Sequence, residues 1–75
     1  MSRLPVVSCK EVIKALAKLG YWIRDRESSH IHLRHSIRQP LTIPDHKEIA
    51  RGTLRAIIRG SGLTVEEFRK LIKDN

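Results

Sequence analysis

The fold is decided by an alternating stretch, Arg26-Glu27-Ser28-Ser29-His30-Ile31-His32-Leu33-Arg34. Successive side chains of a β-strand point to opposite faces, so Ile31 and Leu33 can enter a core while polar groups line the other face. Those polar groups are His30, His32 and Arg34. Residues 27–29 predict a tight connection. We therefore expect His30 at the start of a strand, beside a turn.

Two more strands are predicted around this one. Residues 21–26 favour a strand that forms a hairpin with residues 30–34. Simple alternation places Trp22, Arg24 and Arg26 together on one face of it, and we expect this to be the face of His30. Residues 40–44 have a proline at each end and predict a short edge strand, where a missing N–H group does no harm.

Helices are predicted before and after these strands in the sequence. Ser8 with Glu11 has the spacing of a capping box, and Gly20 has the position of a helix stop. A second helix is expected within residues 49–59 and is ended by residues 60–62. Thr64 with Glu67 forms a second capping box, which predicts a short final helix.

The predicted order is α-β-β-β-α-α, which is an α+β fold. It has a three-stranded antiparallel sheet with helices on one face and a short C-terminal helix. A chain of 75 residues suits one small domain, so we expect residues 1–75 to form a single unit.

Composition indicates an anionic partner. Lys and Arg number 15 against 8 Asp and Glu, giving a net charge of +7. Such a field attracts nucleic acid, an anionic membrane or an acidic protein. No apolar run approaches the roughly 20 residues of a membrane span. Cys9 is the only cysteine, so no internal disulfide is possible, and we expect a cytoplasmic protein.

His30 is the candidate catalytic residue. Because an imidazole titrates near neutral pH, it can act on RNA as a general base at a 2′-hydroxyl or as a general acid at the leaving 5′-oxygen. This route requires no metal or other cofactor, and only RNA carries the 2′-hydroxyl. Arginines on the same face would stabilise the phosphate, and Trp22 would stack a base.

Other interpretations are open for several residues. His30 and His32 have metal-ligand spacing, with His35 or His46 as a third ligand, but we expect no carboxylate or thiolate nearby to complete a site. His35 is expected to be structural. Cys9 is expected to be inert, and Ser29 points away from the adjacent His30, which disfavours a serine nucleophile. Three arginines spaced four residues apart form a basic stripe on the second predicted helix, which either faces solvent or binds phosphate: Arg51, Arg55 and Arg59.

Several short sequence motifs spread along the chain carry a family resemblance. They are Pro5-Val6-Val7-Ser8, Leu19-Gly20-Tyr21, Ser29-His30, Pro44 with His46, and Gly52-Thr53-Leu54 with Ile58. In this ordered set the sequence resembles the HicA family of bacterial toxins, the mRNA interferases of type II toxin–antitoxin modules. Two positions depart from the family pattern: Ser28 stands where the family has glycine, and Cys9 where it often has glycine.

The resemblance implies a double-stranded-RNA-binding-like α-β-β-β-α fold and ribosome-independent cleavage of mRNA. It implies that His30 is catalytic, and that a HicB-like antitoxin with a partly folded RNase-H-like domain covers the active face. No membrane association and no sequence-specific DNA binding by this chain are expected. The alternatives are a non-catalytic basic RNA-binding module and a subunit that binds only an acidic protein. The predicted RNA-binding residues are Trp22, Arg24, Arg26, Ser29, His32, Arg34, Arg51 and Arg55.

Overall fold

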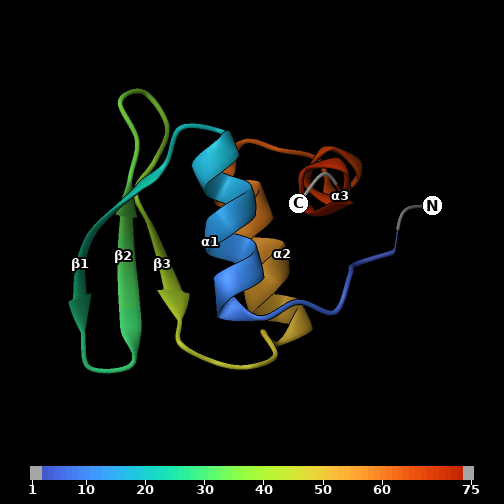
Figure 1. The fold of residues 1–75 in the computed structure, drawn as a ribbon. Coiled ribbons are helices and arrows are strands. Elements are labelled where there is room, and N and C mark those ends of the chain that lie inside the picture. The colour runs from blue at the N-terminus through green and yellow to red at the C-terminus, as the bar shows by residue number, and fades with distance from the viewer. Residues whose placement is uncertain (1–2, 74–75) are drawn as a thin grey trace.

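The predicted α-β-β-β-α-α order is confirmed. A computed structural model describes residues 3–73 of the protein. Figure 1 shows the three strands side by side, with the helices packed together next to them. The elements are α1 Cys9–Lys18, β1 Trp22–Glu27, β2 His30–Arg34, β3 Leu41–Pro44, α2 Arg51–Ser61 and α3 Val65–Lys73. None of these helices has both the length and the apolar character that crossing a membrane requires.

The sheet is antiparallel, with β2 in the centre and β1 and β3 at the edges. Its inner face is built by alternation, as predicted: Ile31 pairs with Ile43, and Leu33 pairs with Leu41. All four side chains are buried in the core against the helices. Burial of apolar side chains of this size stabilises a fold by roughly 1.5–3 kcal/mol each. The residues between them along β2 therefore face outward.

A β-bulge interrupts the pairing of β1 with β2. Ile23 lies opposite Leu33, but the next paired residue on β1 is Asp25, which lies opposite His32. Arg24 is the extra residue, and an extra residue reverses the alternation of every side chain after it. The outer face of the hairpin consequently carries Asp25 and Glu27. Arg26, which lies between them, faces inward.

Local hydrogen bonds set the bounds of α1. The Ser8 hydroxyl accepts from the Glu11 N–H at 3.2 Å, and the Glu11 carboxylate accepts from the Ser8 N–H at 2.9 Å. Gly20 follows the helix with φ 106°, and a Cβ there would lie 2.9 Å from His35 Nε2. The turn into β1 therefore requires glycine for both its backbone and its space.

The C-terminal helices differ from expectation at one boundary. The prediction that residues 60–62 lie outside the second helix is wrong for Gly60 and Ser61, because α2 runs through Ser61 and ends at Gly62 with φ 83°. The Ser61 hydroxyl donates to the Ile58 carbonyl at 2.7 Å, so this buried polar group is satisfied.

The capping box of Thr64 with Glu67 is confirmed at the start of α3. Hydrogen bonds from the Thr64 backbone and side chain lower the pKa of the Glu67 carboxyl group.

Candidate functional site

His30 begins β2 directly after a two-residue turn. It pairs with Glu27 on β1 and Pro44 on β3, so it lies on the outer face of the sheet, away from the core. The residue is exposed, and within residues 3–73 its ring makes no hydrogen bond or ion pair with another side chain. An imidazole in this position is accessible to a large substrate.

Three backbone hydrogen bonds hold this end of the molecule together. The Asp45 N–H donates to the Ser29 carbonyl at 2.8 Å, which fastens the loop after β3 to the β1–β2 turn. The Cys9 N–H donates to the His46 carbonyl at 3.0 Å. A third bond joins Ile49 to Val7 at 2.8 Å. Figure 1 shows the hairpin turn, the loop and the start of α1 at one end of the fold. The strand end that bears His30 is therefore fixed by segments distant in sequence.

His32 lies beside His30 along β2 and is held by its neighbours. Its Nδ1 is 3.0 Å from Thr42 Oγ1 on β3, and its Nε2 is 3.4 Å from Glu27 Oε1 and 4.0 Å from Asp25 Oδ1 on β1. The expectation that no carboxylate lies near these histidines is wrong, because the bulge turns two of them toward His32. The sequence gives no local sign of the bulge, so Asp25, Glu27 and Thr42 were missed as site residues.

The predicted aromatic and arginine residues of β1 and β2 divide between two faces. Trp22 pairs with Arg34 on the outer face, and Trp22 is 51% exposed. Arg24 lies at the bulge, with its Nε 3.5 Å from Asp25 Oδ2. The prediction that Arg26 shares the face of His30 is wrong, because Arg26 pairs with the inward residue Ile31.

Burial and two charged side chains act on the pKa of Cys9. Burial raises the pKa of the Cys9 thiol, the charge of Asp45 raises it further, and the Arg26 charge lowers it. Arg26 therefore acts on the side of the sheet where α1 begins. Cys9 is buried and its raised pKa disfavours the thiolate, as befits a small core residue without thiolate chemistry.

The predicted residues of the second helix lie in the helical layer. Arg51 and Arg55 are exposed on α2, whose buried residues Leu54, Ile57 and Ile58 face the core. The core thus separates the basic stripe from the outer sheet face. Arg51 begins α2 at the same end of the fold as the hairpin turn, which Figure 1 makes visible.

His35 is a structural residue. Its Nδ1 accepts hydrogen bonds from the Ile37 and Arg38 N–H groups at 3.1 and 3.2 Å, so the proton is on Nε2. Nε2 donates to the Leu19 carbonyl at 2.8 Å, and the ring packs edge-on against Tyr21. Within residues 3–73, no group of three or more His, Cys, Asp or Glu side chains is arranged to hold a metal ion. The structure does not bring His35 together with His30 and His32.

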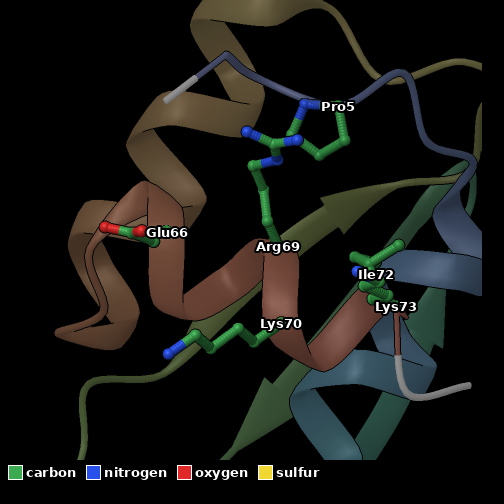
Figure 2. A pocket seen from close by; sticks show the side chains of 6 residues that line it. All are labelled: Pro5, Glu66, Arg69, Lys70, Ile72 and Lys73. Carbon is green, nitrogen blue, oxygen red and sulfur yellow. The ribbon is translucent and has the colours of Figure 1, made fainter. Parts of the chain in front are cut away.

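Two open hollows lie outside the outer sheet face. One, of about 380 Å³, lies at the end of the fold that bears His30 and is lined by Ser8, Cys9, Lys10, Asp45, His46 and Lys47. The other, of about 510 Å³, lies between the N-terminal segment and α3. Figure 2 shows Arg69 reaching from α3 toward Pro5 across it. None of the predicted site residues lines either hollow.

The turn before His30 has a strained residue. Ser28 has φ 58°, a left-handed conformation that glycine adopts freely and other residues do not. We expect Ser28→Gly to raise the free energy of unfolding by roughly 0.5–1 kcal/mol, since relief of strain exceeds the added freedom of the unfolded chain. Urea unfolding measures this change. Ser29→Gly is the matched control, because Ser29 has no positive φ and gains nothing from glycine. Equal stabilisation by both substitutions would contradict the assignment of strain to Ser28.

Comparison with known proteins identifies the family of this chain. A family model described as the HicA toxin of bacterial toxin–antitoxin systems matches residues 9–63 of the 75-residue chain. None of the curated proteins compared with the sequence matches it. The matched residues are more than half of the chain and include the hairpin, His30, the loop after β3 and all of α2. The protein therefore belongs to the HicA family and is a toxin of a bacterial toxin–antitoxin system.

Proposed function

We propose that the protein is a metal-independent endoribonuclease that cleaves mRNA in the cytoplasm, with His30 as a catalytic residue. The observation that carries this proposal is the position of His30, exposed on the outer sheet face at an end fixed by backbone hydrogen bonds. Toxins of the HicA family generally cleave RNA, which supports the same conclusion.

Proton transfer is the chemistry that His30 supplies. The 2′-oxygen of the ribose attacks the adjacent phosphorus, and the bond from phosphorus to the 5′-oxygen breaks. An imidazole beside the phosphate can take the proton from the attacking oxygen or give one to the leaving oxygen. DNA lacks the attacking group, so RNA alone is a substrate for this route.

The positive charge of the domain attracts RNA. With a net charge of +7, most of the binding free energy would come from phosphate contacts that weaken with salt. Arg34 and Trp22 share the face of His30 and are suited to hold a phosphate and a base. Arg24 and Ser29 lie close by along β1 and in the turn. Three of the predicted arginines lie away from the outer sheet face and would contact more distant parts of the bound RNA: Arg26, Arg51 and Arg55.

One experiment separates the enzyme from a non-catalytic RNA-binding module. The purified protein is incubated in EDTA with a single-stranded RNA and, in parallel, with a DNA of the same sequence. We expect the RNA to be cleaved and the DNA to remain intact. RNA that is bound but never cut would contradict the proposal and identify a binding module.

The partner we propose is a HicB-like antitoxin. The family match implies an antitoxin partner for this toxin. A basic toxin is silenced most directly by an acidic protein that covers its catalytic face and excludes RNA. The surface we assign to this contact contains Trp22, Arg24, His30 and His32, or the loop at Asp45 and His46.

Charge reversal tests this assignment. We expect Arg24→Glu to lower the rate of antitoxin association by roughly tenfold at low salt, because steering between opposite charges is lost. Stopped-flow binding at two salt concentrations measures the rate, and salt should slow association more than it speeds dissociation. Arg59→Glu on α2 makes the same charge change in the helical layer and should affect association less. An unchanged, salt-independent rate for Arg24→Glu would mean that the antitoxin uses another surface.

A further inference from the structure

Glu27 places a carboxylate directly opposite His30 across the hairpin. We propose that Glu27 is the second catalytic group, acting as the general base while His30 acts as the general acid; this inference rests on the proposed ribonuclease function. The two residues flank the two-residue turn and are direct partners across β1 and β2. Side chains of such partners lie on the same face, with Cβ atoms about 4.5–5.5 Å apart.

The bulge at Arg24 creates this arrangement. With regular alternation, Arg26 would lie on the outer face and Glu27 on the inner face. The extra residue reverses them, so that Glu27 lies opposite His30 and Arg26 lies opposite Ile31. Bulges frequently occur beside active sites, where they redirect a side chain. Here the redirected side chain is a carboxylate, and it is 83% exposed, so an RNA strand can reach it.

A fixed neighbour holds Glu27 in place. His32 Nδ1 is 3.0 Å from Thr42 Oγ1, which leaves Nε2 facing the Glu27 carboxylate at 3.4 Å. The His32 side chain is 30% exposed, whereas that of Glu27 is 83% exposed. His32 is therefore a positioning residue, which orients the carboxylate without itself exchanging a proton with RNA.

Other ionisable groups at this end fit the role less well. Asp25 lies two residue pairs farther from His30, opposite His32, and Arg24 contacts its carboxylate at 3.5 Å. Asp45 and His46 line the hollow beside the start of α1 rather than the outer sheet face. Arg34 is on the same face but cannot accept a proton. Glu27 is the group that can accept a proton directly opposite His30.

The reaction balances with these two residues. The Glu27 carboxylate takes the proton of the 2′-hydroxyl as the 2′-oxygen forms its bond to phosphorus. The bond from phosphorus to the 5′-oxygen breaks with its electron pair, and protonated His30 gives its proton to that oxygen. The products are a 2′,3′-cyclic phosphate and a 5′-hydroxyl. Glu27 is left protonated and His30 neutral, and exchange with water restores both.

The test is the pH dependence of RNA cleavage in EDTA by wild-type protein and Glu27→Gln. A reaction that needs one deprotonated base and one protonated acid has a bell-shaped pH profile, so wild-type cleavage should show a rising limb and a falling limb. Glu27→Gln should be about 100-fold slower, should lose the rising limb and should keep the falling one. It should bind RNA at least as tightly, because a negative charge is removed from the binding face.

Two further variants make the result specific. Glu66→Gln on α3 removes the same charge far from the sheet and should leave the rate and the pH profile unchanged. His32→Ala should be slowed only severalfold and should keep both limbs, because it removes the positioning residue alone. An unchanged profile in folded Glu27→Gln, with cleavage still dependent on His30, overturns the role of Glu27 and leaves the ribonuclease intact. A wild-type protein that does not cleave RNA overturns both.

Discussion

Replacement of His30 by alanine is expected to abolish RNA cleavage and bacterial growth arrest while the domain stays folded. The side chain is exposed on the outer sheet face, so its removal leaves no cavity in the core. A group that transfers a proton in the transition state contributes about 10²–10⁴-fold to the rate. RNA cleavage in EDTA and growth after induction measure the two losses.

RNA binding should survive this substitution, because phosphate contacts supply most of the affinity. His46→Ala is the matched control: it removes a histidine from the same end of the fold that lies off the outer face, and cleavage should persist. Full cleavage by a folded His30→Ala variant would show that the catalytic group lies elsewhere on the protein.

Replacement of Phe68 by alanine is expected to cost about 3–5 kcal/mol of unfolding free energy. Phe68 is fully buried and is the residue by which α3 enters the core. Lys18 Nζ of α1 also donates to the Leu71 carbonyl near the end of α3 at 3.0 Å, but this exposed hydrogen bond cannot replace the lost apolar burial. Small domains have total stabilities of roughly 5–15 kcal/mol, so the variant should be largely or partly unfolded.

Urea unfolding followed by circular dichroism measures this loss. Arg69→Ala is the control, since it changes the adjacent exposed residue of the same helix and should alter stability by no more than about 0.5 kcal/mol. A loss below about 1 kcal/mol for Phe68→Ala would mean that α3 contributes little to the core, contrary to its burial here.

The helix boundaries were the most predictable part of the fold. Both capping boxes, Ser8 with Glu11 and Thr64 with Glu67, appear as hydrogen bonds between residues three apart. Such contacts depend on local sequence alone, so a single chain suffices to predict them. The end of α2 was less predictable, because Gly60 and Gly62 offer two stops and only Gly62 adopts the left-handed conformation.

The candidate site was predictable only along β2. His30 and His32 occupy the outer face, as alternation requires, because Ile31 and Leu33 are drawn into the core. On β1 the same reasoning failed after Arg24. A bulge depends on the register that the whole sheet adopts, and every residue of β1 is exposed, so no apolar pattern in that strand fixes its faces.

The bulge leaves the site on the predicted face of the sheet but changes which side chains of β1 lie beside the histidines. Regular alternation predicted arginines around His30, an arrangement in which a single histidine transfers protons and the arginines bind the phosphate. The actual register places Glu27 opposite His30 and Asp25 opposite His32. A histidine with a carboxylate partner is equipped for both proton transfers of RNA cleavage.

The central claim is that this sheet face cleaves RNA through the 2′-hydroxyl, with protein side chains moving the protons. The most direct test is the chemical identity of the RNA ends produced in EDTA, determined by mass spectrometry of a short defined RNA. We expect a 2′,3′-cyclic phosphate on the upstream fragment and a 5′-hydroxyl on the downstream fragment. A 3′-hydroxyl with a 5′-phosphate would mean that water attacked the phosphorus, and would contradict the mechanism.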